Sequence, residues 1–381
     1  MENKKELGIY IHIPFCKQKC YYCDFISYSN KCDIAQKYIN CLLDEIEKFD
    51  FENYDVNTIY IGGGTPSYID SKYIKMIMSK IKSKVDFEQN KIEITIEVNP
   101  GTVTKEKLND YKEAGVNRLS IGLQSVKDDL LKQIGRIHTD EDFLNTYQLA
   151  NEVGFNNINV DLMIGLPNQS IKDIKETLEK IIELNPNHIS VYSLIVEEGT
   201  KFDNMINKGE LNLPDEDTER NMYWYVKNTL ESNSYNHYEI SNFAKENKES
   251  KHNMNCWEQK EYIGFGVSAH SYINCVRFSN TGNINEYIKN IEENNIEKNK
   301  TIEEKQTKQD EMNEFMMLGF RKIEGVNISE FKQKFIDNPI FLYREKLEEL
   351  VNEELIEIDL DYIRLTNKGL DLANYVFEEF V

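Results

Sequence analysis

The sequence predicts an α/β protein: a partial (β/α)6 barrel followed by a C-terminal helical, winged-helix-like domain. Two observations favour this fold. Short runs rich in β-branched residues alternate with segments of helical periodicity through the first half of the 381 residues, and several of these runs are apolar on both faces. Such alternation is typical of parallel βα units with right-handed crossovers, whose strands are covered on both sides. We therefore expect the functional site at the carboxyl ends of the strands.

Six strands and five intervening helices account for the first half of the chain. The strands are expected at residues 8–13, 58–61, 92–98, 118–123, 158–164 and 188–196, where β-branched and aromatic residues concentrate. The helices are expected at residues 34–49, 71–84, 104–114, 141–153 and 171–184, where apolar residues recur every three or four positions.

The regular alternation stops beyond residue 213. Residues 217–232 predict a helix and 237–240 a short strand, while 251–272 predict mainly loops. Residues 287–309 are rich in Asn, Lys and Glu and predict a solvated linker or exposed helix. From 310 to 381 we expect three helices, a two-stranded wing at 355–359 and 362–366, and a last helix. We therefore divide the chain into a barrel (1–213), a barrel extension with linker (214–300) and a C-terminal domain (301–381).

The composition excludes several classes of protein. Hydrophobic residues make up 40% of the chain, which suffices for a large core and excludes wholesale disorder. The net charge of −21 disfavours nucleic acids and anionic membranes as partners, and it argues against DNA binding by the winged-helix-like domain. No apolar run approaches the ~20 residues of a membrane-spanning helix, and no signal peptide is visible. We therefore expect a cytoplasmic protein.

The strongest chemical signal is a CxxxCxxC motif directly after the first predicted strand. It consists of Cys16, Cys20 and Cys23, and the other four cysteines are scattered, unlike the even framework of a disulfide-linked secreted domain. Three thiolates can hold three irons of a [4Fe–4S] cluster, which leaves the fourth iron open to an external ligand. A zinc site completed by a distant residue and three unrelated thiols are the alternatives.

Glycine and polar side chains follow the next strands. The second strand runs into the GGGT segment at residues 62–65, whose backbone can approach a ligand closely. Glu97, Gln124 and Asp161 stand at or near the ends of the third, fourth and fifth strands, and Arg136 follows the fourth. Because parallel strands end at the same rim of a barrel, we expect these side chains to form one site.

These motifs resemble those of the oxygen-independent coproporphyrinogen III oxidase family of radical S-adenosylmethionine (SAM) proteins. The matching segments occur along the chain in the same order as in the family. They are YIHIPFCKQKCYYCDF, IGGGTPS, EVNPGT, LSIGLQS, GRIHT, NVDLMIGLP, SVYSLIVEEGT, HNMNCW and GFGVSAHS. Within the family the chain is most similar to the heme-chaperone branch. The resemblance implies a radical SAM barrel, in which one electron from the cluster cleaves SAM to a 5′-deoxyadenosyl radical.

The resemblance also assigns residues to the cofactors. Cys16, Cys20 and Cys23 are the implied cluster ligands. The implied SAM contacts are Tyr10, Gly63, Gly64, Thr65, Glu97, Gln124, Arg136 and Asp161. The chemistry of these residues fits SAM. The glycine backbone can contact the amino group of SAM, Arg136 can pair with its carboxylate, and Asp161 can hydrogen-bond its ribose hydroxyls. Phe25, two residues after the last cysteine, is expected to pack on the adenine.

Two departures from the family pattern bear on function. The oxidases carry a fourth cysteine where this chain has Phe25, which argues against coproporphyrinogen decarboxylation. HNMNCW resembles the HNxxYW heme motif of the chaperones, with Cys256 in place of tyrosine. Since histidine and thiolate both ligate heme iron, His252 is the expected ligand and Cys256 an alternative. On local sequence alone, His252 would be an exposed loop histidine.

The resemblance implies a heme chaperone that passes heme to apo-hemoproteins such as respiratory enzymes. Its cofactors would be a [4Fe–4S] cluster and SAM, its cargo heme, and a further partner a flavodoxin- or ferredoxin-type electron donor. The alternatives are oxidative decarboxylation of coproporphyrinogen III to protoporphyrinogen IX, radical opening of the heme ring, and a zinc-binding structural protein. Whether the chain turns over a substrate as an oxidoreductase stays open at this point.

Overall fold

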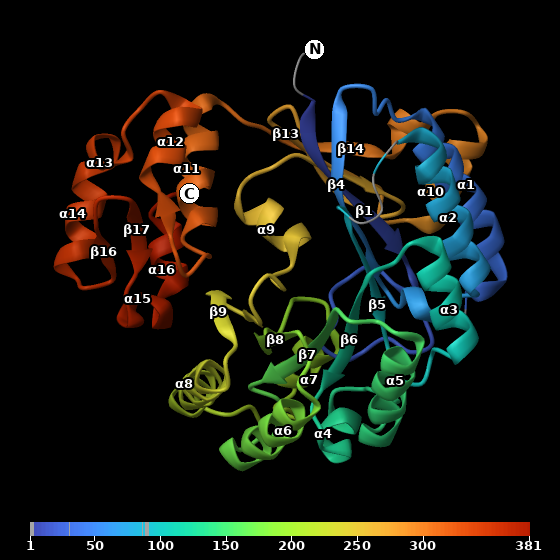
Figure 1. Ribbon diagram of the computed structural model, residues 1–381, viewed down its shortest axis with the longest axis horizontal. Coiled ribbons are helices and arrows are strands. Elements are labelled where there is room, and N and C mark those ends of the chain that lie inside the picture. The colour runs from blue at the N-terminus through green and yellow to red at the C-terminus, as the bar shows by residue number, and fades with distance from the viewer. Residues whose placement is uncertain (1–3, 30, 86, 88–90) are drawn as a thin grey trace.

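The computed structural model describes residues 4–29, 31–85, 87 and 91–381 and is built around one large sheet with helices packed on it (Figure 1). Six parallel strands neighbour one another in chain order at its centre: β1 (Lys5–Ile13), β4 (Tyr54–Gly63), β5 (Glu93–Val98), β6 (Arg118–Gln124), β7 (Ile158–Ile164) and β8 (His188–Ser193). The predicted α/β fold with six βα units is confirmed. The last strand ends at Ser193 rather than at residue 196.

The predicted helices follow these strands. They are α1 (Ala35–Lys48), α2 (Ser71–Lys84), α3 (Lys105–Ala114), α5 (Asp140–Val153) and α6 (Ile171–Leu184), and a short α4 (Asp128–Gln133) was not predicted. End signals explain their bounds. Thr139 and Ser170 each form a capping box with the aspartate three residues on, and Gly115 and Gly154 end α3 and α5 with φ of 105° and 88°.

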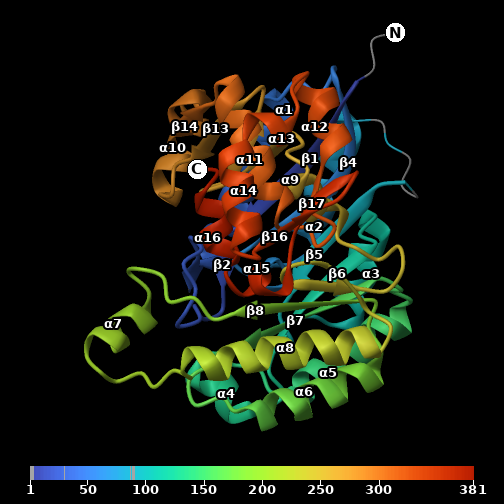
Figure 2. The same cartoon turned by 90° about the vertical axis from the view of Figure 1, so that its left-hand side faces the viewer.

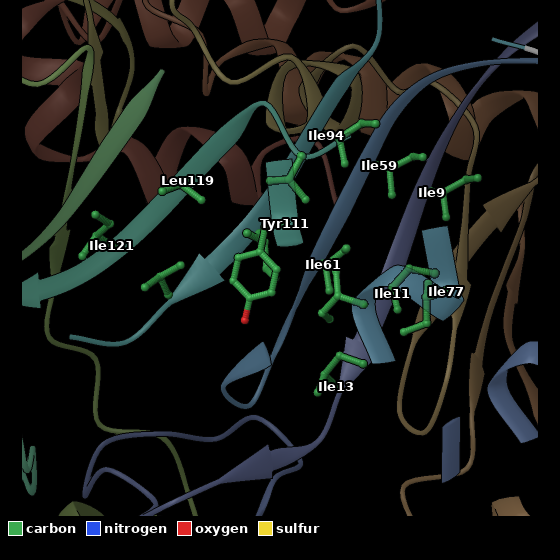
Figure 3. Close-up of a cluster of buried hydrophobic side chains, with 14 of the residues drawn as sticks. Ile9, Ile11, Ile13, Ile59, Ile61, Ile77, Ile94, Tyr111, Leu119 and Ile121 are labelled. Carbon is green, nitrogen blue, oxygen red and sulfur yellow. The ribbon is translucent and has the colours of Figure 1, made fainter. Parts of the chain in front are cut away.

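The main core lies between the sheet and the helices that cover its outer face (Figure 3). Every second residue of β1 points into it, namely Ile9, Ile11 and Ile13, and all three are fully buried. Ile77 of α2 and Tyr111 of α3 pack on the same cluster. Because side chains alternate along a strand, the other residues of β1 face the opposite, inner side of the sheet.

The inner face of the six strands is polar. In β8, Ile189 and Val191 face the core, whereas His188, Ser190 and Tyr192 alternate with them. The expectation that such runs are apolar on both faces is therefore wrong for the inner face. These polar groups pair with one another; His188 Nδ1 lies 2.6 Å from Asn159 Oδ1. The strands thus enclose a polar lumen, which suits a charged ligand better than an apolar one.

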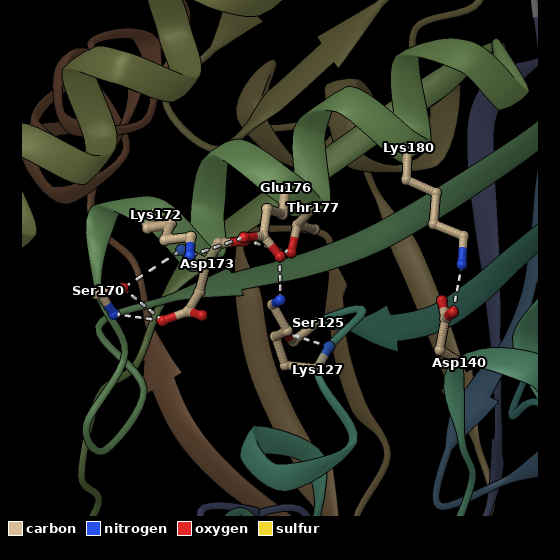
Figure 4. Close-up of polar contacts among 9 residues, drawn as sticks. All are labelled: Ser125, Lys127, Asp140, Ser170, Lys172, Asp173, Glu176, Thr177 and Lys180. Atoms are coloured by element: carbon tan, nitrogen blue, oxygen red, sulfur yellow. Dashed lines mark hydrogen bonds and ion pairs between the residues drawn. The ribbon is translucent and has the colours of Figure 1, made fainter.

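Polar contacts tie α6 to its neighbours on the outside of the barrel (Figure 4). Ser170 Oγ donates to Asp173 at 2.6 Å in the capping box. Further along, Glu176 pairs with Lys127 and Lys180 pairs with Asp140. These side chains are partly exposed, so the pairs contribute little stability and mainly set how α6 lies against α5 and the start of α4.

The central strands are extended on both sides by further strands, of which only the one at Asn236–Glu239 was predicted, as a short strand at 237–240. On the β1 side follow β11 (Tyr262–Phe265), β12 (His270–Ile273), β13 (Val276–Asn280) and β14 (Lys300–Lys305); on the β8 side follow β10 (Asn242–Ala244) and β9 (Asn236–Glu239). Among these, β11 is parallel to β1 and β10 is antiparallel to β8.

Two predictions for this region are wrong. Residues 251–272 are not mainly loops, because they contain α9 (Lys251–Trp257) and β11. Residues 287–309 are neither a solvated linker nor a fully exposed helix, because they contain the end of α10 (Ile284–Glu292), one face of which is buried, and all of β14. Tyr287 and Ile291 bury one face of α10, and the Tyr287 hydroxyl donates to Glu45 at 2.6 Å. The charged residues that suggested a linker occupy the other face.

The C-terminal domain has its own core and a small sheet. Its elements are α11 (Lys308–Gly319), β15 (Val326–Asn327), α12 (Ile328–Phe335), α13 (Pro339–Leu342), α14 (Arg344–Asn352), β16 (Ile356–Ile358), β17 (Tyr362–Leu365), α15 (Asn367–Asp371) and α16 (Ala373–Glu378). The predicted wing, β16 and β17, gains β15 as a third strand. The division at residues 213 and 300 stays a prediction; β14 crosses the second boundary. Within the described residues, no helix is long and apolar enough to span a bilayer.

Candidate functional site

The three cysteines of the CxxxCxxC motif lie in the loop after β1. β2 (Phe15–Cys16) pairs with β3 (Tyr28–Ser29) and closes this loop. Cys16 is buried, and Cys20 and Cys23 are partly exposed. Burial raises the pKa of the Cys16 thiol, and burial together with the neighbouring Cys20 raises that of Cys23 to about 11. The thiols of Cys16 and Cys23 therefore need a nearby cation, such as cluster iron, to become thiolates at neutral pH.

The GGGT segment holds the end of β4 against the cysteine loop. The Gly64 N–H donates to Ile13 O and the Thr65 N–H to Phe15 O, both at 2.9 Å. A Cβ atom on Gly64 would lie 3.0 Å from Cys16 Sγ and 2.9 Å from Ile13 O. At Gly63, whose φ is 107°, a Cβ would lie 2.5 Å from the His12 ring. Both positions therefore require glycine, which lets the backbone approach the loop.

Glu97 lies in the lumen beside the GGGT segment. Its carboxylate accepts hydrogen bonds from the Tyr60 hydroxyl at 2.9 Å and from the Gly63 N–H at 3.2 Å. Enclosure in the lumen, with Asp161 nearby, raises the pKa of Glu97 to about 7. Tyr10 stacks on Tyr60 with ring centroids 6.3 Å apart. Sequence reasoning missed Tyr60, although it stands on the inner face of the strand that leads into the GGGT segment.

Arg136 is held at the rim through Asn99. Its Nη1 donates to Asn99 Oδ1 at 2.8 Å, and Asn99 Nδ2 donates to Thr65 Oγ1 at 3.0 Å. Asn99 was not singled out from the sequence, although it belongs to EVNPGT. Gln124 is buried with φ of 64°, a conformation that costs a non-glycine residue energy. Among the described residues, Gln124 Oε1 and Arg136 Nε have no hydrogen-bond partner.

Asp161 completes the polar side of the lumen. It accepts hydrogen bonds from Asn159 Nδ2 at 2.7 Å and from Ser120 Oγ at 3.1 Å, and burial raises its pKa. Its charge acts on Glu97, as does that of Arg136, so the three groups belong to one electrostatic environment. Unlike these buried residues, Phe25 has a side chain that is 59% exposed. Its packing on an adenine stays a prediction.

His252 contacts the ring of Tyr60, whose hydroxyl is hydrogen-bonded to Glu97. It is the second residue of α9 and is buried, so its description as an exposed loop histidine is wrong. Its Nδ1 lies 2.9 Å from Thr58 Oγ1, and its ring stacks on Tyr60 at 5.2 Å. Burial, with a smaller effect from Arg118, lowers its pKa to about 4, so the ring is neutral at physiological pH. A metal could reach only the nitrogen that Thr58 leaves free.

Cys256 lies one turn further along α9 and is partly exposed. Burial raises the pKa of its thiol to about 11, against the opposing effect of Arg277. A thiol that is protonated at neutral pH is a poor metal ligand until a metal displaces its proton. Heme ligation by His252 and by Cys256 both stay predictions.

The residues around the cysteine loop fit a [4Fe–4S] cluster with SAM. A cavity beside the loop is lined by Cys20, Thr65, Asn99 and Arg136. The unpartnered atoms of Gln124 and Arg136 call for a polar ligand at the same rim. Within the described part of the chain, no three His, Cys, Asp or Glu side chains converge as a single zinc ion requires. Cluster cysteines bind three different irons and need no such convergence.

Comparison with protein families identifies two domains. A model of the radical SAM superfamily matches residues 10–181, and one of the HemN C-terminal domain matches residues 306–372. One solved structure has the same architecture. Coproporphyrinogen III oxidase (HemN) from Escherichia coli superposes with a TM-score of 0.86 over 99% of this chain and 90% of that one. At 24% identity, this likeness shows the fold alone.

Curated relatives are similar along the full length. The chain is 39% identical over 378 residues to the heme chaperone HemW of Lactococcus lactis, covering 99% of this chain and 98% of that protein. It is 40% identical over 374 residues to the HemW of Bacillus subtilis, covering 98% of each. With the HemW of Escherichia coli it shares 33% identity over 380 residues, again covering 98% of each.

Proposed function

The chain belongs to the HemW family, within the radical SAM superfamily, and we propose on this premise that it is a heme chaperone, which binds heme and transfers it to apo-hemoproteins. The observation that carries the proposal is full-length similarity to proteins named heme chaperone HemW. Phe25 adds support, because it stands where the oxidases of the wider family carry a further cysteine.

Membership of the radical SAM superfamily implies a [4Fe–4S] cluster and SAM as cofactors. Bound together, they supply an electron and a 5′-deoxyadenosyl radical. In our proposal Cys16, Cys20 and Cys23 hold the cluster. Gly64, whose N–H donates to Ile13 O, and Thr65, whose hydroxyl donates to Cys16 Sγ, would keep the loop closed.

SAM would lie in the polar lumen at the carboxyl ends of the strands. We propose that Arg136, oriented by Asn99, pairs with its carboxylate, and that Glu97 and the Gly63–Gly64 backbone meet its amino group. Asp161 would accept from its ribose hydroxyls. Tyr10 and Gln124 face the same lumen and would line it, as the stacking of Tyr10 on Tyr60 supports.

The partners belong to the same proposal. Heme is the cargo, the acceptors are apo-hemoproteins such as respiratory enzymes, and a flavodoxin or ferredoxin would reduce the cluster. The cytoplasm is the expected location. Hand-off of intact heme needs no radical, so the cluster would serve loading or transfer.

His252 is the proposed heme ligand, and an anaerobic titration tests it. Heme is added to cluster-reconstituted protein and the Soret band is followed. We expect saturable binding by the wild type and at least about tenfold weaker binding by His252→Ala, because an axial ligand is lost. Leu108→Ala, which truncates a buried side chain of α3 in the outer core, controls for general destabilisation and should bind as the wild type does.

Two outcomes would contradict this account in different ways. Unchanged affinity of His252→Ala would exclude His252 as the ligand and leave the chaperone proposal standing. Absence of saturable binding by the wild type would contradict the chaperone proposal itself.

A further inference from the structure

A cavity of about 720 Å³ lies between the barrel and the C-terminal domain. The barrel contributes the end of β8, α8 (Glu216–Ser232), the β9–β10 turn and α9, and the C-terminal domain contributes α15 and α16. Figure 2 shows α8 below β8 and the C-terminal elements above it. The volume is within the range of cavities that hold organic ligands and cofactors, about 300–1,000 Å³.

Aromatic and aliphatic side chains form much of the cavity wall. The largest of them are Tyr192, Tyr223, Trp257, Tyr375 and Phe377. Ile195, at the same cavity, is 66% exposed and Tyr192 is 41% exposed. Several large apolar side chains that line one concave surface are typical of a site for a bulky apolar ligand.

Four buried polar atoms at this cavity have no hydrogen-bond partner among the described residues. They are the acceptors Glu239 Oε2 and Asn242 Oδ1 and the donors Trp257 Nε1 and Arg321 Nε. Glu239 is fully buried and Asn242 is 2% exposed. Buried polar groups are almost always hydrogen-bonded, and of these four atoms only Glu239 Oε2 has a long ion pair instead. Four such atoms around one cavity indicate a polar ligand group or ordered water there.

Arg321 is the most available cation of the cavity. Its guanidinium stacks on the Trp257 ring at 4.3 Å and lies near Phe377 at 6.0 Å. Its ion pair with Glu239 is long, at 4.0 Å. Arg220, the other arginine, already pairs with Asp217 and Asp371. One arginine over an aromatic wall suits a flat ring that carries a carboxylate.

Acidic side chains limit how many carboxylates the ligand can carry. Glu216, Glu219, Glu239 and Asp371 line the cavity together with the two arginines. A ligand with many negative charges would meet repulsion from this lining. The cavity therefore favours a mostly apolar ring with few carboxylates.

The cavity also adjoins the lumen and the HNMNCW segment. Tyr192 lines it and belongs to the inner face of β8, which encloses the lumen. Asn253 and Trp257 of α9 line it as well, whereas His252 points the other way, to Thr58. The two sides of α9 thus face two different spaces.

We propose that this cavity holds the tetrapyrrole ring of the cargo, stacked against its aromatic wall with one propionate on Arg321. The proposal rests on the chaperone function above and adds a place for the ring that is separate from His252. Because His252 faces Thr58 on the other side of α9, it cannot ligate the iron of a ring in this cavity. Binding at this place depends on the ring and its propionates, so iron is not required.

Metal-free protoporphyrin IX tests the assignment, because it has the ring and two propionates without the iron. Binding to full-length, cluster-reconstituted protein is followed by its fluorescence, beside a parallel heme titration. We expect saturable binding by the wild type, and weaker binding of coproporphyrin III, which carries four carboxylates. Arg321→Gln should weaken protoporphyrin binding about tenfold through loss of a charge-assisted hydrogen bond.

A second variant and a control make the test independent of folding defects. Ile195→Trp fills the cavity from an exposed loop and should also weaken binding severalfold. Arg344→Gln removes an exposed arginine of α14, outside the cavity, and should bind as the wild type does. Circular dichroism and thermal unfolding confirm that each variant is folded.

The outcomes separate the two proposals. If the wild type binds heme but not protoporphyrin IX, or if folded Arg321→Gln and Ile195→Trp both bind it with unchanged affinity, the ring does not lie in this cavity. Equal or tighter binding of coproporphyrin III would equally overturn the assignment. If the wild type binds no heme at all, the chaperone proposal fails first.

Discussion

The lumen contains ionisable residues whose pKa values differ from their usual values. Glu97 accepts hydrogen bonds from Tyr60 and Gly63, and its pKa is raised to about 7. His252, which stacks on Tyr60, has its pKa lowered to about 4. Burial is the main cause in both cases, and it favours the neutral form of each group. A positively charged ligand such as SAM would restore the charge of Glu97 when it binds.

The raised pKa of Glu97 predicts a pH-dependent stability in the absence of SAM. The usual value is 4.5, so between pH 4.5 and about 7 the native state keeps a proton that the unfolded chain has lost. The free energy of unfolding therefore falls as pH rises through this window. Because glutamine cannot ionise, Glu97→Gln should gain roughly 1–3 kcal/mol relative to the wild type between pH 5 and pH 8.

Urea unfolding at several pH values measures this difference. A gap between Glu97→Gln and wild type that does not change with pH would show that Glu97 titrates normally. Glu106→Gln, an exposed residue of α3, should show no comparable trend.

The close packing of Gly64 predicts that one added methyl group disturbs the cluster loop. A Cβ there would lie 2.9 Å from Ile13 O and 3.0 Å from both Cys16 Sγ and Phe15 N. Gly64→Ala should therefore displace Cys16, destabilise the chain by about 1–3 kcal/mol and reduce the iron and sulfide bound after reconstitution. Gly282→Ala is the matched control, since its Cβ would meet its nearest atom at an ordinary 3.7 Å. Full cluster content in Gly64→Ala would contradict the proposed role of the GGGT segment.

At the scale of elements, α9 connects the barrel with the cavity beyond it. Glu93 of β5 accepts from the backbone N–H groups of Lys251 and His252, at 3.3 and 3.2 Å. Asn255 donates to Asn57 at 2.9 Å. A carboxylate at the start of a helix also meets the positive end of its dipole. α9 is thus held by polar contacts with inner-face residues.

Removal of Glu93 should loosen this helix. We expect Glu93→Ala to lower the free energy of unfolding by about 1–3 kcal/mol, because it leaves buried donors unpaired. Amide hydrogen exchange should become faster within residues 251–257. Glu348→Ala, on the exposed side of α14, should leave exchange in this segment unchanged. Exchange as slow in Glu93→Ala as in the wild type would show that other contacts hold α9.

The elements also show where sequence reasoning succeeds. α2, α6 and β7 follow the predicted bounds, because each has regular periodicity or a clear end signal, such as the capping box of Ser170. α9, β11 and β14 were missed, because they are short and their burial depends on distant partners. β14, for example, is mostly exposed and is defined by its pairing with β13.

The same reasoning applies to the site. Cys16, Glu97 and Arg136 could be found because they stand in recognisable motifs at strand ends. Tyr60 and Asn99 were missed, since their importance lies in contacts across strands. The cavity beyond α9 could not be predicted from the sequence, because it forms only where the C-terminal domain meets the barrel.

At the scale of the whole molecule, polar contacts join the C-terminal domain to the barrel. Glu314 of α11 pairs with Arg277 of β13 and accepts from Gln259 Nε2 at 2.8 Å. Gln259 in turn accepts from Lys334 of α12 at 2.7 Å. Interfaces of this polar kind allow relative movement more readily than large apolar ones. A cavity at such an interface can load and release a bulky cargo without unfolding either domain.

Transfer of heme tests the chaperone function most directly. Cluster-reconstituted protein is loaded with heme, freed of excess and mixed anaerobically with an apo-hemoprotein. We predict that intact heme moves to the acceptor, seen as loss of the donor's Soret band and gain of the acceptor's. Heme that stays bound under all conditions, or a ring that is consumed when SAM and reductant are added, would contradict the account.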